Sequence, residues 1–208
     1  YPFRGCTALE HIIIPASVTK VTSYGTDSSL TNLKTAGPIG SGCNIEFAWT
    51  DELRASAFED CIYLESVTLP EGIKTISEYA FHGCEALVSV IIPVTVTSIG
   101  NSAFYGCTSL ESVTIPYGVT SIGQSSFRGC TSLTTVTIPD SVTSIDYGAF
   151  ANCTGLIKII IPQSVTSIGD AFEGCSELTT AGPINGGFSI EFGWTDIIPN
   201  NAFRDCTG

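Results

Sequence analysis

The 208-residue sequence has few basic side chains and no long apolar segment. Lysine and arginine together number 8, against 20 aspartates and glutamates, which gives a formal charge of -12. A surface of that sign disfavours binding to nucleic acid and to anionic membrane surfaces. No run of 18 apolar residues occurs, so the sequence predicts no membrane-spanning helix and no membrane insertion by this segment.

Residues arranged for catalysis or metal binding are equally scarce. The chain has no GxSxG, Walker or HExxH motif. It has no CxxC pair, and its two histidines, His11 and His82, do not complete a zinc site of ordinary spacing. The sequence therefore predicts no enzyme, no metal site and no cofactor.

What the chain does have is a repeat with a cysteine at its start. A fixed period of about 20 to 50 residues is the signature of a solenoid or another repeat architecture. Here the period is 23 residues, with one step of 22 at the end: Cys61, Cys84, Cys107, Cys130, Cys153 and Cys175. The unit at residues 130–152 reads CTSLTTVTIPDSVTSIDYGAFAN, and the preceding unit at 107–129 reads CTSLESVTIPYGVTSIGQSSFRG.

The first half of the unit at 130–152 predicts a short strand. Residues 133–138 have the spacing LxxVxI of a leucine-rich repeat. Alternation places Val136 and Ile138 inward, with Thr135 and Thr137 outward. Pro139 ends the strand, because it has no N–H to donate to a ladder.

The second half of the unit predicts another extended run and then a turn. Residues 142–145 alternate and are rich in β-branched side chains, and Asp146-Tyr147-Gly148 is a turn signal. The following Ala149-Phe150 is expected to form one helical or 3-10 turn that directs Phe150 inward. One coil cannot bury its own apolar residues, but coils stacked at about 4.8 Å place equivalent side chains on one another and form a continuous core.

The whole unit, C-x-x-L-x-x-V-x-I-P-x-x-V-T-x-I-G-x-x-A-F-x-G, resembles the BspA-like class of leucine-rich repeats of secreted and surface proteins. In the unit at 107–129 the matching residues are Leu110, Val113, Ile115, Pro116, Val119, Ile122, Gly123 and Phe127. A generic β-helix is the other fold that stacked strands allow. The resemblance implies an α/β repeat fold, a right-handed leucine-rich-repeat solenoid with mostly short strands and one short helical or 3-10 turn per coil. It also implies adhesion or protein binding, without a catalytic residue.

The repeat predicts a single domain over residues 1–208 with about eight coils. Long coils are expected at 30–60 and 175–205, because both share Gly-Pro-Ile followed by Ile-Glu-Phe-x-Trp-Thr-Asp. Each inserts a Gly-rich bulge, at 40–42 and 185–187, which we expect in an exposed hairpin or loop. Neither end of the chain has the polar capping repeat that solenoids need, so a fragment of a longer array is expected.

The cysteines and tryptophans each allow two interpretations. Eight of the nine cysteines are in the repeat register, where disulfides between neighbouring coils or free core thiols are possible. Leu30 occupies the ladder position of Cys175, which favours a packed, free thiol over a disulfide. Trp49 and Trp194 are candidate binding anchors, but alternation through 45–49 favours a core position for Trp49.

The candidate binding residues are those that the alternation directs outward along the strands, on the expected concave face. We name the following ten the outward row: Ser66, Thr68, Ser89, Ile91, Ser112, Thr114, Thr135, Thr137, Lys158 and Ile160. Equivalent positions toward the two ends are His11, Ile13, Thr35, Gly37, Thr180 and Gly182. The row is rich in small hydroxyls and lacks Tyr, Trp and Arg, so a simply solvated sheet face is the alternative. The Gly-rich bulges are a second candidate site.

The function expected from these features is an extracellular or cell-surface module for protein binding or adhesion. Its partner would be a macromolecule of a host or of a neighbouring cell, either protein or glycan, and not nucleic acid. One alternative is a structural spacer in a surface protein. Another is ice or carbohydrate binding by the regular threonine rows.

Overall fold

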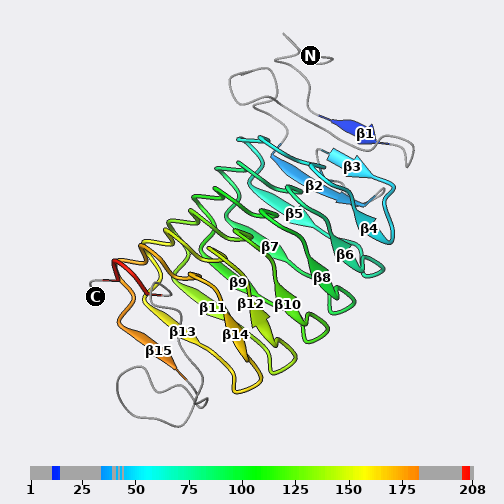
Figure 1. Ribbon diagram of the computed structural model, residues 1–208. Helices are drawn as coiled ribbons and strands as arrows, with labels where there is room; N and C mark the ends of the chain where they lie inside the picture. Colours follow the sequence, from blue (N-terminus) through cyan, green and yellow to red (C-terminus); the bar gives the residue numbers. More distant parts are fainter. Residues whose placement is uncertain are drawn as a thin grey trace.

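The computed structural model describes residues 11–14, 34–38, 41, 43, 45–182 and 203–206. Most of the predicted first coil and of the long coil at 175–205 lies outside these residues, as does the second Gly-rich bulge. Within the described part, the chain forms a right-handed parallel β-solenoid whose coils stack along one axis (Figure 1). This part of the fold prediction is confirmed.

The strand predicted in the first half of each unit is present and joins a parallel ladder. The two sheets on this side have the orders β1-β3-β2-β5-β7 and β15-β13-β11-β9, and β7 contacts β9. The strands are β1 Ile12–Ile14, β2 Thr35–Pro38, β3 Ile45–Phe47, β5 Ser66–Thr68, β7 Ser89–Ile91, β9 Ser112–Thr114, β11 Thr135–Thr137, β13 Lys158–Ile160 and β15 Thr180–Gly182.

The extended run in the second half of the unit forms a sheet of its own. One or two residues of each coil pair in parallel with the equivalent residues of the next coil. The strands of this second sheet are β4 Glu52–Leu53, β6 Thr75–Ile76, β8 Ser98–Ile99, β10 Ser121–Ile122, β12 Ser144–Ile145 and β14 Ser167–Ile168. Each regular coil therefore has two ladder strands, on two sides of the solenoid.

The prediction of a helical or 3-10 turn per coil is wrong, because the segment consists of successive turns that bond to the next coil. The N–H groups of Ser126 and Arg128 donate to residues three positions earlier, but those of Ser125 and Phe127 donate to Tyr147 and Ala149 of the following coil. Ser125 also has a φ of 53°, which is left-handed. A helix would direct all these donors inside its own coil and leave the coils without this ladder.

The core of the solenoid contains the six predicted residues of the unit at 130–152, and all are buried: Leu133, Val136, Ile138, Val142, Ile145 and Phe150. The phenylalanines form a continuous stack along the axis. Neighbouring ring centroids in it lie 5.1 to 5.6 Å apart with interplanar angles of 16° or less, from Phe58 to Phe203. This prediction of the core is confirmed.

The long coil contributes an additional strand instead of a hairpin. Strands β2 and β3 are parallel neighbours, with Ala36 opposite Ile45 and Gly37 opposite Glu46. The bulge between them therefore connects parallel strands, which excludes the hairpin alternative. Trp49 is buried and stacks on Phe47 at 5.1 Å, so its predicted core position is confirmed.

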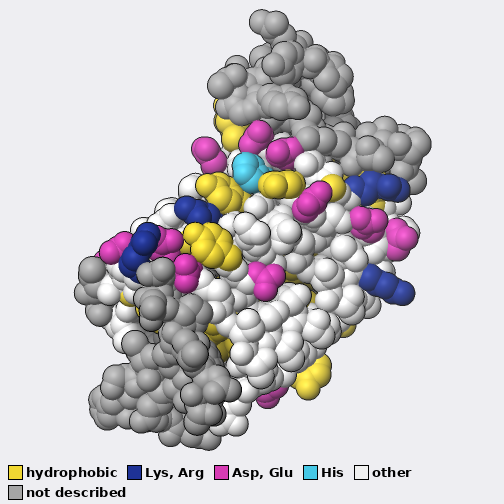
Figure 2. All heavy atoms as spheres, viewed as in Figure 1, with side chains coloured by type: hydrophobic (Ala, Val, Ile, Leu, Met, Phe, Trp, Pro, Cys, Tyr) yellow, Lys and Arg dark blue, Asp and Glu magenta, His cyan; other side chains and the backbone are white. Residues whose placement is uncertain are grey.

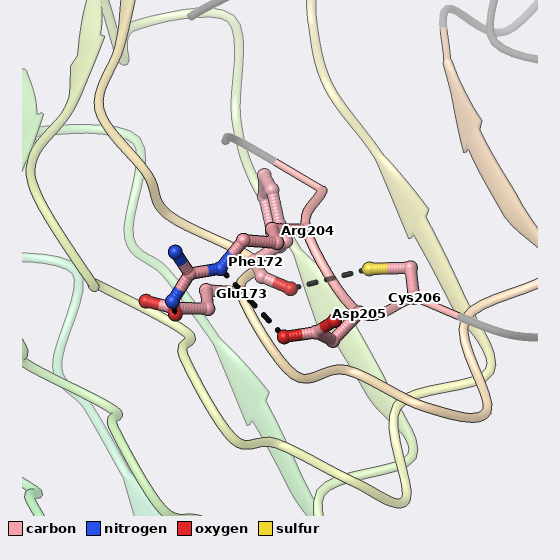
Figure 3. A network of polar contacts seen from close by, with 5 residues as sticks. All are labelled: Phe172, Glu173, Arg204, Asp205 and Cys206. Carbon is pink, nitrogen blue, oxygen red and sulfur yellow. Dashed lines mark hydrogen bonds and ion pairs between the residues drawn. The ribbon is translucent and has the colours of Figure 1, made fainter. Parts of the chain in front are cut away.

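The described residues near the C-terminus continue the same stacking. Figure 3 shows that Cys206 directs its Sγ to the carbonyl oxygen of Phe172, and that Arg204 pairs with Glu173. The Arg204 carbonyl also accepts a hydrogen bond from Gly174 N at 2.8 Å. Residues 203–206 thus dock on the coil that begins at Cys153. Within the residues described, no helix is long and apolar enough to cross a membrane.

Candidate functional site

The outward row occupies one continuous side of β5, β7, β9, β11 and β13. Its members are exposed, apart from the half-buried Ser66 and Ile160. Pairing in register aligns them between β5 and β7 and from β9 to β13, and β7 lies against β9, so they form two columns along the solenoid axis. The columns are Ser66, Ser89, Ser112, Thr135 and Lys158, and Thr68, Ile91, Thr114, Thr137 and Ile160. The predicted orientation of these side chains is confirmed, whereas their role in binding stays a prediction.

The row is polar but almost uncharged. Lys158 is its only ionisable member, and Ile91 is its most exposed apolar residue, with 78% of its surface accessible. Asp and Glu side chains are scattered over the face of the molecule that Figure 2 draws, in keeping with the formal charge of -12. A ligand on the row would meet hydroxyl groups and methyl groups at fixed intervals, because the ladder holds every position.

The row does not continue as an open surface onto β2 and β3. A Cβ atom on Gly37 would lie 2.7 Å from Ser41 Oγ and 2.9 Å from Cys43 Sγ, so the bulge covers this strand. Gly37 is buried, contrary to its predicted outward exposure. Its strand neighbour Glu46 is only 7% exposed, with Oε1 3.9 Å from His11 Nε2. The described bulge residues therefore close one end of the row.

The repeat cysteines from Cys61 to Cys175 are core residues. Cys84, Cys107, Cys130 and Cys153 are free and buried, as predicted. Each thiol donates to the carbonyl oxygen of the phenylalanine 26 residues earlier; for example, Cys130 Sγ lies 3.2 Å from the Phe104 oxygen. Burial raises the pKa of the Cys130 thiol from 9.0 to about 12. In the part of the chain described, no group of three or more Cys, His, Asp or Glu residues could hold a metal ion.

One aromatic cluster on the turn edge was missed by the sequence reasoning. His82 stacks on Tyr105 with centroids 4.9 Å apart and contacts Tyr79 edge-on at 5.7 Å. Its Nδ1 lies 3.8 Å from the Asp60 carboxylate. Residues one period apart are neighbours in the stack, so His82 and Tyr105 could have been paired from their spacing of 23.

Parallel ladders, a period of 23 residues and the LxxVxI strand together define the fold class as a leucine-rich-repeat solenoid. The BspA type leucine-rich repeat region matches residues 51–179 in six copies. The chain belongs to this BspA-type family, as its repeat unit indicated.

Solved structures with the same architecture come from several bacteria. The leucine-rich repeat protein TpLRR of T. pallidum is 29% identical, with a TM-score of 0.67 over 84% of this chain and 75% of that chain. A leucine-rich repeat protein of Bacteroides ovatus ATCC 8483 is 30% identical, with a TM-score of 0.65 over 82% of this chain and 45% of its own.

A leucine-rich cell surface protein of Faecalibacterium prausnitzii A2-165 is 25% identical, with a TM-score of 0.55. Its match covers 89% of this chain and 62% of its own, so this chain spans less than two thirds of it and of the Bacteroides ovatus protein. A comparison with curated protein sequences gave no match.

Proposed function

We propose that the chain is a protein-binding scaffold of a secreted or cell-surface protein, and that it binds through the outward row. The observation that carries the proposal is the alignment of exposed side chains in two columns on a ladder of parallel strands. The family supports a scaffold for protein interaction, and the neighbour from Faecalibacterium prausnitzii supports a place at the cell surface. Leucine-rich-repeat solenoids are typically non-catalytic, which agrees with this role.

The composition of the row determines how strongly it binds. Interfaces owe most of their affinity to a few buried Trp, Tyr and Arg side chains, and the row contains none of these. Each coil therefore adds a weak contact, and affinity comes from many coils acting on one partner or on repeated epitopes. We expect micromolar or weaker binding by this chain.

The same lack of anchors favours the second candidate function, a structural spacer. In that role the hydroxyl-rich row would simply keep the solenoid hydrated. The two functions differ in whether changing the row alters any interaction.

The test uses the 208-residue chain as bait for proteins of host extracellular matrix and mucus, followed by affinity measurement with the captured protein. The row variant replaces Ile91, Thr114 and Thr137 by Lys; these residues share one column and point away from the core. We expect it to fold like the parent and to lose binding by about tenfold or more.

The matched control places three lysines on the side of the second sheet, at Ser98, Ser121 and Thr143. Ser98 and Ser121 lie on strands β8 and β10, Thr143 directly precedes β12, and all three are exposed. The control adds the same charge, so a loss of binding in the row variant alone locates the interface. If both variants remain folded and bind like the parent, the row is not the site.

A further inference from the structure

A shallow groove of about 420 Å³ lies along the second sheet, where the strands end and the turn segment begins. Its volume is within the range of small-ligand sites, roughly 300–1,000 Å³. It crosses four coils and is lined by Asn101, Gln124, Ile145, Asp146, Tyr147, Ser167, Ile168 and Gly169. Because β12 and β14 provide three of these residues, the groove belongs to the second sheet and is separate from the outward row.

The groove is found where the sequence departs from its own repeat. The two preceding coils and the following coil have Gly100, Gly123 and Gly169 at this position, whereas the central coil has Asp146; the earlier coils have Arg54 and Ser77. A Cβ on Gly100 or Gly169 would lie 2.6 or 2.7 Å from a backbone nitrogen of the preceding coil, so stacking favours glycine at these two residues. The departure at Asp146 is therefore not required by the core.

Tyr147 is the second departure. Its equivalents in the two preceding coils are the polar Asn101 and Gln124, yet Tyr147 is an aromatic side chain that is 50% exposed. The following coil is one residue shorter, because Cys153 and Cys175 are 22 residues apart. Backbone bonds locate the missing residue after Asp170: Gly148 N donates to Asp170 O, and Phe150 N donates to Ala171 O. With Gly169 alongside and a residue absent, one side of Tyr147 is left open.

The polar groups of the groove are arranged around this ring. The Asn101 Oδ1 accepts a hydrogen bond from the backbone N–H of Gln124 at 3.1 Å. This bond fixes the Asn101 side chain and leaves the N–H groups of its amide free to donate to a ligand. Among the described residues, the side chains of Gln124, Asp146 and Ser167 have no hydrogen-bond partner of their own. The groove thus offers an exposed aromatic face, two carboxamides, a hydroxyl and a carboxylate, and no Lys or Arg lines it.

We propose that this groove binds a neutral saccharide. The C–H face of a pyranose packs on a tyrosine ring, while amide and carboxylate groups bind neighbouring hydroxyls in the plane of the sugar. Asp146 and the formal charge of -12 disfavour anionic sugars. The proposal concerns a site apart from the outward row and does not rest on the proposed function.

The test titrates the 208-residue chain with defined sugars and follows binding by saturation-transfer difference NMR. N-acetyllactosamine and mannotriose represent glycoprotein glycans, maltotriose and xylotriose represent polysaccharides, and 3′-sialyllactose is the anionic comparison. We expect at least one neutral sugar to bind with millimolar affinity and sialyllactose to bind more weakly. The preferred pair identifies the source of the glycan.

Three variants locate the binding. Tyr147→Ala should weaken it about tenfold or more, whereas Tyr147→Phe should retain it. Asp146→Gly introduces the residue that the two preceding coils and the following coil have at this position, so it should fold normally and bind more weakly than the parent. Tyr117→Ala, at a tyrosine 72% exposed and outside the groove, is the control and should bind like the parent.

Two results would overturn the proposal: no binding of any neutral sugar to the parent, or equal binding by the parent and a folded Tyr147→Ala variant. The row variant with lysines at 91, 114 and 137 separates the two sites. If it loses the protein partner and keeps the sugar, both proposals stand; if it keeps the partner while Tyr147→Ala loses the sugar, only the groove is supported.

Discussion

Replacing Phe150 by Ala should be among the most costly single changes in this chain. Phe150 is fully buried, and its ring lies between those of Phe127 and Phe172, at centroid distances of 5.3 and 5.5 Å. Each aromatic pair contributes about 0.5–1.5 kcal/mol beyond the burial of its area. Both pairs are lost together with the transfer free energy of the ring.

The neighbouring coils cannot close the cavity. Phe127 N and Phe150 N each donate to the next coil at 2.8 Å, and these bonds keep the coil spacing fixed. The free energy of unfolding should therefore fall by about 3–5 kcal/mol, the usual cost of Phe→Ala in a rigid core.

Urea unfolding followed by circular dichroism measures this change. Tyr117→Ala removes an exposed aromatic ring and should alter the free energy of unfolding by no more than about 0.5 kcal/mol. A loss below about 1 kcal/mol for Phe150→Ala, or one equal to that of the control, would refute the stacked core.

Three further predictions follow from the cysteine column and the glycines. With the Cys130 pKa raised to about 12, its thiol should react slowly with a disulfide reagent at pH 8 in native buffer and rapidly in denaturant; fast native reaction would contradict the buried position. Because unfolded thiols ionise near pH 9 and this buried one near 12, the free energy of unfolding should decrease as pH rises from 9 to 12, with a shallower decrease in Cys130→Ala. Gly100→Ala should destabilise the fold by about 1–3 kcal/mol, since its Cβ would lie 2.6 Å from Glu78 N; wild-type stability would exclude that clash.

The sequence was sufficient to predict everything that the period itself encodes. Residues 23 apart become ladder neighbours, so the inward positions of Val136, Ile138 and Phe150 followed from alternation and stacking. The free state of Cys130 followed from the same logic, because a position that accepts leucine is an apolar core position.

The turn segment could not be predicted in this way. Ala-Phe before a cysteine is compatible with a helical turn, and only the hydrogen bonds between coils make the successive turns preferable. Those bonds depend on neighbours that local sequence preference does not include. The additional strand β3 was missed for a related reason, since the Gly-rich bulge between Pro38 and Ile45 permitted a loop, a hairpin or a return to the same sheet.

The candidate groove was visible in the sequence only as an irregularity. Asp146-Tyr147 interrupts the repeated Ile-Gly, and the spacing of 22 before Cys175 marks a lost residue. The Asp146-Tyr147 substitution and the missing residue lie in adjacent coils, and together they leave one side of the Tyr147 ring open. Such a coincidence becomes apparent once the coils are stacked.

The coil-to-coil ladder also has a consequence for inheritance. The two faces of each coil are alike, because each coil has the same apolar residues at the same positions; Leu110 is equivalent to Leu133, and Phe127 stacks on Phe150. Unequal recombination that adds or removes 23 codons therefore joins compatible surfaces and yields a foldable chain. The length of the array can change between generations while the fold of every coil is retained, and exposed positions can diverge without affecting the register.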